Sequence, residues 1–353
     1  MLTRPRLASP LAVALAAALV PAACSAAAPG AASDPTASTG PAAPAAAGTV
    51  TQGGTLNIDF ATYNPLSLVI KNQGWLETEL TDQDITVNWV KSAGSNKANE
   101  ALRAEAIDVG STAGSAALLA RSNGSPIQVI DIYSQPEWAA IVVPDGTSIA
   151  SVADLKGKRI AATKGTDPYF FLLQSIQEAG LAPTDVTVEV LQHADGWAAL
   201  QNGSVDAWAG LDPIMAGAEQ AGASLLYRNV GFNSYGFLNA TETFLTTKPD
   251  LAQAVVDAYE HARAWAQEHP DETAQYVATE AGLDLAVATK VITERSNLDV
   301  DPIPGAAQVS VLEKIGPIFV ELGDVKAQAD VDAALSTLLN PTFVTRAEPG
   351  RFD

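Results

Sequence analysis

Two separate stretches of the chain repeat the same order of apolar and polar positions. The first starts with the apolar run of residues 56–60, passes a polar loop and Pro65, and continues in a helical pattern. The second starts with residues 160–162, passes a polar loop and Pro168, and again continues in a helical pattern. A short apolar run followed by apolar spacing of period 3.6 predicts a strand and then a helix. The chain therefore contains two strand-loop-helix modules of one plan.

Modules of this kind predict an α/β fold of two lobes, each a central sheet flanked by helices. Open α/β sheets bind ligands beyond the carboxyl ends of their strands, where helix N-termini point backbone N–H groups at the ligand. Two lobes that face each other across such edges form a clamp. The sequence therefore predicts a ligand cleft between the lobes.

The order of the predicted elements also sets the lobe boundaries. We assign residues 55–143 and 237–345 to lobe I and residues 144–236 to lobe II. Beyond Pro249 the pattern is nearly all helical up to Leu339, which predicts a helical layer that completes lobe I. Two crossings of the chain between the lobes predict a hinge.

The N-terminus is typical of an export signal. Arg4 and Arg6 precede an apolar run of residues 11–23 that ends in small residues, which predicts a signal peptide over residues 1–23. Cys24 follows Pro21-Ala22-Ala23 and resembles the lipidated cysteine of a bacterial lipobox, although Pro21 stands where leucine is usual. The alternative is a secreted protein with an incidental cysteine. Residues 24–54 are rich in Ala, Pro, Gly, Ser and Thr, so we expect a disordered tether from the membrane.

Charge and cysteine content exclude several classes of function. The formal net charge of -20 disfavours nucleic acid as a partner, although a helix N-terminus can still bind a small anion locally. No cysteine follows Cys24, so the body has no disulfide and no cysteine-based metal or nucleophilic site. The three histidines show no metal spacing. We therefore expect no metal, no cofactor and no catalytic residues.

Several segments together resemble one family. They are Gly110-Ser111-Thr112, residues 154–158, Lys164-Gly165-Thr166, residues 205–208 and Asp212-Pro213. In this order and spacing they resemble the solute-binding proteins of ABC importers for sulfonates, taurine and nitrate. The resemblance covers about residues 56–339 and implies the two-lobed periplasmic-binding-protein type II fold. It also implies a small organic anion, an aliphatic sulfonate above all, delivered to a membrane permease that a cytoplasmic ATPase powers.

The predicted loops suit such a ligand. A sulfonate is a permanent anion that only accepts hydrogen bonds, so small and hydroxyl residues at helix starts are compatible with it. Ordinary N-capping explains the same residue types, and the two roles are compatible. The candidates for the anion are Ser92, Gly94, Ser95, Ser111, Thr112, Ala113, Lys164, Gly165, Thr166 and Asp167.

Other candidates concern the organic part of the ligand. Tyr63, Asn64 and Tyr169 lie in strand-to-helix loops, and Trp138 follows Glu137 between two strands. The aromatic side chains line the ligand's tail or belong to the core. Asp212 pairs with an ammonium group such as that of taurine, or caps its helix.

The function implied by the resemblance is that of an extracytoplasmic solute-binding subunit, anchored to the cell membrane as a lipoprotein. The alternatives are binding of nitrate, bicarbonate or a thiamine precursor, and a ligand-sensing subunit of the same fold. An enzyme is disfavoured, because a related family that builds the thiamine pyrimidine depends on a cysteine-rich segment. Residues 25–353 contain no cysteine, no Gly-x-Ser-x-Gly elbow, no His-Glu-x-x-His pair and no Walker loop.

Overall fold

The computed structural model describes residues 50–353 of the chain. The predicted signal peptide, Cys24 and most of the predicted tether lie outside these described residues. The end of the tether does not, because the backbone N–H and the hydroxyl of Thr51 donate hydrogen bonds to Asp250, and Gly54 begins the first strand. The prediction of a tether up to residue 54 is wrong at these last residues, which hydrogen bonds fix to the body.

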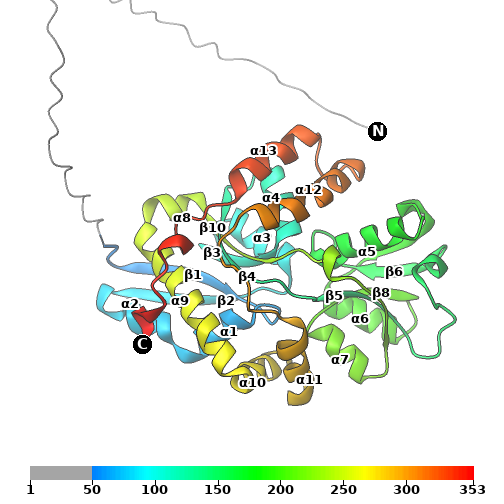
Figure 1. The fold of residues 1–353 in the computed structure, drawn as a ribbon, viewed down its shortest axis with the longest axis horizontal. Helices are drawn as coiled ribbons and strands as arrows, with labels where there is room; N and C mark the ends of the chain where they lie inside the picture. Colours follow the sequence, from blue (N-terminus) through cyan, green and yellow to red (C-terminus); the bar gives the residue numbers. More distant parts are fainter. Residues whose placement is uncertain (1–49) are drawn as a thin grey trace, which may run out of the picture. The chain divides into compact units, whose positions relative to one another are not determined.

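Lobe I is built on a mixed five-stranded sheet with the order β2-β1-β3-β10-β4 (Figure 1). β1 runs parallel to β2 and β3, whereas β10 runs antiparallel to both β3 and β4. The strand bounds are β1 Gly54–Phe60, β2 Ile85–Lys91, β3 Val109–Ala113, β4 Ile127–Ser134 and β10 Gly236–Thr241.

Lobe II repeats this plan in a second five-stranded sheet with the order β7-β6-β8-β5-β9. β6 runs parallel to β7 and β8, and the strand beyond β8, which is β5, is antiparallel to its neighbours. The bounds are β5 Ala139–Val143, β6 Arg159–Ala162, β7 Thr187–Val190, β8 Ala207–Leu211 and β9 Ser224–Arg228. The two sheets confirm the two-lobed α/β fold predicted from the internal repeat.

Helices cover both sheets (Figure 1). Those of the first half of lobe I are α1 Pro65–Gln73, α2 Trp75–Leu80, α3 Ser95–Arg103 and α4 Gly114–Ser122. Those of lobe II are α5 Asp167–Glu178, α6 His193–Gln201 and α7 Ile214–Gln220. The C-terminal part contributes α8 Glu242–Thr247, α9 Pro249–Glu268, α10 Pro270–Ala281, α11 Leu285–Lys290, the π-helical turn η5 Val291–Arg295, α12 Ala306–Glu321 and α13 Gln328–Leu338. None of the described helices is long and apolar enough to cross a membrane.

The hinge differs from the predicted boundary. β5 pairs with β8 and β9, so it belongs to lobe II, and the first crossing lies at residues 135–138 instead of after residue 143. The sequence did not reveal this because β4 and β5 are both short apolar runs with the same pattern. The chain returns to lobe I between β9 and β10, close to the predicted position.

Besides the two crossings, a C-terminal segment of the chain also joins the two lobes, and the sequence did not predict this contact. The segment after η5 runs along the first crossing, where the backbone N–H of Glu137 donates to the carbonyl of Arg295 and that of Gln135 donates to Asn297. α10 packs on α1 of lobe I, while α11 packs on α7 of lobe II. The segment from α10 to Asn297, residues 270–297, therefore contacts both lobes next to the hinge, and we call it the C-terminal arm (Figure 1).

Central strands are buried in both sheets, and the edge strands differ, since β4 is almost wholly buried as well. Every residue of β8 and β10 is buried, as expected for central strands covered on both faces. The edge strand β7 is mostly exposed. Pro65 and Pro168 each occupy a first-turn position of their helices, where proline costs no hydrogen bond. The strand ends and the helix starts of both lobes are thereby fixed at the cleft.

Candidate functional site

A buried carboxylate of lobe II joins the two lobes. Asp167 begins α5, is 1% exposed, and accepts hydrogen bonds from the hydroxyls of Ser115 and Ser234, both at 2.6 Å. It also accepts from the backbone N–H of Ser234 at 2.7 Å and from Nε1 of Trp138 at 2.8 Å. Burial raises the pKa of Asp167, and these four hydrogen bonds oppose that rise. The predicted site residue Asp167 thus uses its oxygens within the protein.

A second buried carboxylate lies in lobe I. Asp59 is the last residue but one of β1, has no exposed surface, and accepts hydrogen bonds from the backbone N–H of Ser111 at 2.9 Å and from its hydroxyl at 3.1 Å. The Ser92 hydroxyl is its third partner. Burial raises the pKa of Asp59 to about 7, although the three hydrogen bonds lower it. Two serines predicted to bind a ligand anion therefore donate to the protein's own carboxylate.

The loop of residues 111–115 differs from its prediction as a helix start. Ser111, Thr112 and Ala113 lie in β3, because β10 pairs along the whole of this strand, and α4 starts only at Gly114. The N–H of Ala113 donates to Ser95 at 2.9 Å. The Thr112 hydroxyl donates to the Ala113 carbonyl. These groups already have partners in the sheet and at its edge.

The predicted loop of lobe II lies against lobe I. Lys164 is 48% exposed and pairs with Asp324 between α12 and α13 at 2.6 Å, which raises the pKa of the lysine. Gly165 adopts φ +78, a conformation that favours glycine. Thr166 donates to the carbonyl of Thr163 and is 1% exposed. The loop forms a contact between the lobes without a free cation.

The start of α3 meets the start of α6 across the cleft. A Cβ at Gly94 would lie 3.1 Å from Nε2 of His193, so glycine permits this approach. The hydroxyl of Thr163 donates to Leu191 and accepts from Nδ1 of His193, which we therefore assign as the protonated nitrogen. Burial lowers the pKa of His193 to about 4, so the ring is neutral at pH 7.

A small cavity lies where both lobes and the C-terminal arm meet. Its volume is about 20 Å³, which is enough for one water-sized molecule. Its lining combines the apolar residues Pro65, Pro136, Trp138, Val277, Val291 and Ile292 with the polar or charged residues Thr62, Ser134, Asp212, Arg295 and Ser296, and Tyr63 completes it. An amphiphilic lining of this kind is typical of a site for an organic ion.

Two predicted aromatic residues shape this cavity. The rings of Tyr63 and Trp138 pack edge to face with centroids 6.1 Å apart. The Tyr63 hydroxyl donates to the carbonyl of Ser111, and Nε1 of Trp138 donates to Asp167. Both polar groups therefore already have acceptors within the protein. Tyr169 packs instead on Phe170, with centroids 5.3 Å apart.

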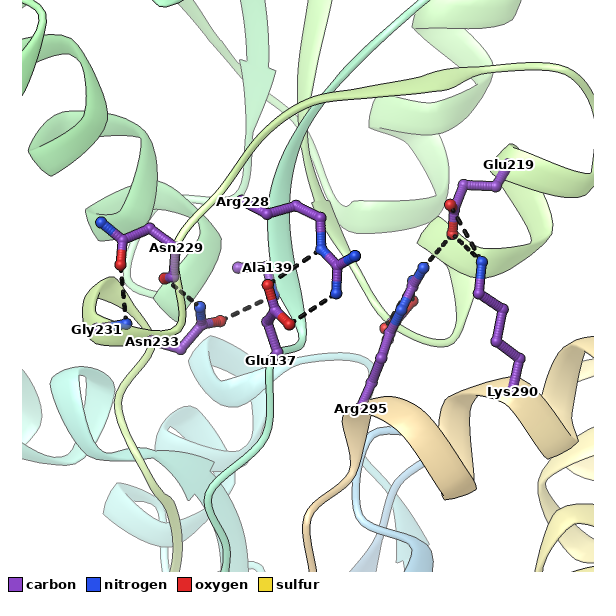
Figure 2. A network of polar contacts seen from close by, with 10 residues as sticks. Glu137, Ala139, Glu219, Arg228, Asn229, Gly231, Asn233, Lys290 and Arg295 are labelled. Carbon is purple, nitrogen blue, oxygen red and sulfur yellow. Dashed lines mark hydrogen bonds and ion pairs between the residues drawn. The ribbon is translucent and has the colours of Figure 1, made fainter.

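An ion-pair network includes two residues that line the cavity, Asp212 and Arg295. Nη1 of Arg295 lies 3.2 Å from both oxygens of Asp212, and Nη2 contacts Glu219, which also binds Lys290 (Figure 2). Asp212 accepts from the backbone N–H of Ala216 as well, so it caps α7. Burial raises the pKa of Asp212 to about 6, while Arg295 opposes the rise. The network joins α11 and η5 to lobe II.

Two further candidates lie outside the cavity. Glu137 pairs with Arg228 through two hydrogen bonds of 3.0 and 2.7 Å on the surface of the hinge (Figure 2). Asn64 caps α1 by accepting from the N–H of Ser67, and its side chain donates to the Tyr259 hydroxyl. Both side chains stabilise the local fold.

Of the residues predicted from the sequence, Tyr63, Trp138 and Asp212 line the cavity together. The prediction missed Asp59, Ser115 and Arg295. A carboxylate within the apolar run of β1 is a signal that could have identified Asp59. Arg295 has no such signal, because its partner Asp212 is 83 residues away in the sequence. Within residues 50–353 no cluster of His, Cys, Asp and Glu could hold a metal ion.

Comparisons with known proteins agree with this architecture. A family model described as NMT1/THI5 like matches residues 67–273. A Bacillus subtilis (strain 168) protein named "Putative aliphatic sulfonates-binding protein" is 29% identical over 66% of this chain and 71% of its own length.

Two solved structures share the fold. The alkanesulfonate-binding protein SsuA from Xanthomonas axonopodis pv. citri, bound to MOPS, has a TM-score of 0.72 and 26% identity, covering 80% of this chain and 98% of that one. The periplasmic aliphatic sulphonate binding protein SsuA from Escherichia coli has a TM-score of 0.70 and 25% identity, covering 82% of this chain and 92% of that one.

Proposed function

Since the chain belongs to the NMT1/THI5-like family, we propose that it is the solute-binding subunit of an ABC importer. Its ligand in this proposal is a small organic anion, an aliphatic sulfonate such as an alkanesulfonate or taurine. The relatives named above as binding proteins for aliphatic sulfonates support this choice of ligand.

The observation that carries the proposal is the amphiphilic cavity at the hinge between the two lobes. A sulfonate with an alkyl tail has one anionic and one apolar end. Trp138, Val291 and Ile292 contribute apolar groups to the lining of the cavity, and Asp212 and Arg295 contribute charged groups to it. At about 20 Å³ the cavity marks where the lobes leave a gap, and a sulfonate needs more room. The ligand therefore enters with the lobes apart, and the lobes close around it.

The proposed mechanism is closure of the lobes at the hinge. A ligand shifts the equilibrium between open and closed forms only by its greater affinity for the closed form. The contacts of Asp167 with Ser115 and of Lys164 with Asp324 join the lobes in the closed form. A permease that recognises the closed arrangement of the two lobes then accepts the loaded protein.

The proposal places the protein outside the cytoplasm. The predicted signal peptide of residues 1–23 supports export, and Cys24 supports a lipid anchor on the cell membrane. Delivery requires a permease in that membrane and a cytoplasmic ATPase. In this proposal the protein binds its ligand and performs no catalysis, which agrees with the absence of cysteine from residues 25–353 and with the names of its relatives.

Thermal unfolding of residues 25–353 with a panel of anions tests the function. The panel holds taurine, short and long alkanesulfonates, sulfate, nitrate, bicarbonate and thiamine precursors. A ligand that binds only the native state stabilises it by about 2.7 kcal/mol at a hundred times its Kd, so we expect a concentration-dependent rise in Tm with sulfonates. A response to nitrate or a thiamine precursor, with none to sulfonates, would overturn the ligand assignment.

A matched pair of variants tests the position of the site. Ile292→Phe adds volume at a residue that lines the cavity, so we expect it to abolish the sulfonate response. Ile303→Phe makes the same change at a side chain that is 42% exposed, and we expect its response to equal that of the wild type. An unchanged response in Ile292→Phe would place the ligand elsewhere.

A further inference from the structure

The serine donors predicted for a ligand anion are already used by the protein's own carboxylates. The predicted Ser92 and Ser111 bind Asp59, and the neighbouring Ser115, which the prediction missed, binds Asp167. Both carboxylates are at most 1% exposed. A sulfonate at these serines would lose the competition for donors and meet two buried groups of its own sign. The anionic head of a ligand therefore needs a different donor in the cleft.

Arg295 is the cationic side chain that lines the cavity. Its side chain is 1% exposed, and both terminal nitrogens are engaged, Nη1 with Asp212 and Nη2 with Glu219. Nε is different, because among residues 50–353 it finds no acceptor although it is fully buried. A buried, unpaired N–H of a guanidinium is costly, and such a group calls for an acceptor.

The position of Arg295 couples it to the hinge. Its backbone carbonyl accepts from the N–H of Glu137 in the first crossing, while its side chain reaches α7 of lobe II (Figure 2). η5 is a π-helical turn, a feature that is frequent at functional sites. Arg295 therefore contacts both the first crossing and lobe II next to the hinge.

We infer that Arg295 binds the anionic group of the ligand through Nε–H, and that Asp212 opposes this binding from the same cavity. The inference rests on the proposed function. Arg295 and Lys290 balance the charges of Asp212 and Glu219, so a sulfonate adds an uncompensated negative charge. Asp212 lines the cavity with that ligand and repels it. The oxygens of the sulfonate, which only accept hydrogen bonds, match the donor of Nε.

Two arginine-to-lysine variants test the role of Arg295. Arg295→Lys keeps the positive charge beside Asp212 and Glu219 but lacks the Nε–H group. Arg159→Lys makes the same change in an ion pair on lobe II that is 45% exposed at the arginine. Isothermal titration of the chain with alkanesulfonates is expected to show at least about tenfold weaker binding by Arg295→Lys. The control is expected to bind like the wild type.

Asp212→Asn separates ligand recognition from structural support. Asparagine retains an oxygen for the Ala216 N–H and removes the negative charge. We expect sulfonates to bind about tenfold more tightly, because one repulsion is gone and the guanidinium loses its internal anion. If Asp212 only supported the structure, Asp212→Asn would instead weaken the binding of sulfonates.

The outcomes are distinct. Equal affinity of Arg295→Lys and wild type overturns the inference, and so does weaker binding of a sulfonate by Asp212→Asn, which would mean that Asp212 contacts a cationic part of the ligand. If nitrate or bicarbonate binds in place of sulfonates, the proposed ligand fails, and the same variants decide the role of Arg295 with that anion. If the wild type binds no anion at all, both the proposed function and the inference fail.

Discussion

Two carboxylates of lobe II, Asp167 and Asp212, end up buried at the cleft with opposite surroundings. Asp167 is held by hydroxyl, indole and backbone donors, all of them neutral. Asp212 faces the guanidinium of Arg295. At the Asp167 end of the cleft, which we call the neutral end, Asp167 takes up all four donors. At the Asp212 end, which we call the ionic end, Asp212 and Arg295 line a cavity, and Nε–H of Arg295 has no acceptor among the described residues.

This difference separates two tasks within one cleft. Neutral hydrogen bonds to Asp167 connect the start of α5 to α4 and to both crossings, and they leave nothing for a ligand. The ion pair at Asp212 connects the C-terminal arm to lobe II, and Nε of Arg295 has no acceptor among the described residues. We therefore interpret the Asp167 end as the structural closure and the Asp212 end as the ligand-sensing one.

The largest expected effect is at the ionic end. Arg295→Met leaves the Asp212 carboxylate buried without its cation, so we expect a loss of about 3–5 kcal/mol in the free energy of unfolding. Adding Asp212→Leu removes the stranded charge and should restore most of that loss. Urea denaturation of the two single variants and the double variant measures the coupling.

The matched control is the exposed pair of Arg159 and Asp206. Arg159→Met is expected to cost less than about 1 kcal/mol, since solvent screens an exposed ion pair. A cost for Arg295→Met as small as that of the control would show that the buried network contributes little to the closed arrangement.

The next effect is a dependence on pH. The pKa of Asp212 is about 6 in the folded protein against 3.8 for the free side chain, so folding favours its protonated form. This contribution is complete below pH 3.8 and is lost as the pH rises through 6, by up to about 3 kcal/mol. Asparagine does not titrate, so the stability of Asp212→Asn relative to the wild type should rise over this range.

The comparison of two denaturation series isolates Asp212. Asp59 and His193 also titrate between the folded and unfolded states, but both remain in the variant and cancel in the difference. Parallel stability curves from pH 3.5 to 7.5, that is over about four pH units, would mean that Arg295 fully offsets the burial of Asp212.

A smaller effect is expected at the neutral end. Asp167→Ala removes four hydrogen bonds and leaves the indole N–H of Trp138 and the N–H of Ser234 without their acceptor. Burial disfavours the Asp167 charge, however, and its removal offsets part of the cost. We expect a net loss of about 2 kcal/mol. A loss equal to that of Arg295→Met would erase the distinction between the two ends.

The sequence predicted the fold well because the fold depends on local patterns that occur twice. Apolar runs, prolines at helix starts and the spacing between them are properties of short segments. The pairing of β5 with β8 and β9 is not a property of a short segment, since a short apolar run does not indicate which of the two sheets it joins. The first crossing is therefore misplaced in the prediction, although both predicted strand-loop-helix modules are present in the structure.

The site was harder to predict for a related reason. The sequence indicates Ser92 and Ser111 as hydrogen-bond donors, but their acceptor Asp59 is known only from the tertiary structure, as is the contact of Ser115 with Asp167. Arg295 lies in a stretch whose sequence indicates only a helix, and it meets Asp212 because the C-terminal arm returns to lobe II. Side-chain partners that are far apart in the sequence leave no periodic signal.

The smallest effect tests whether the neutral end gains stability from each hydroxyl. Ser115 and Ser234 share one oxygen of Asp167, so Ser115→Ala leaves that oxygen one donor, and we expect a loss of about 1 kcal/mol. Ser122→Ala is the matched control in the same helix, because the Ser122 hydroxyl is buried without a partner among the described residues. Its removal should leave stability unchanged or slightly higher. The measurement is the urea midpoint of unfolding for both variants. Equal midpoints would show that the 2.6 Å hydrogen bond from Ser115 to Asp167 adds no net stability to the contact between the lobes.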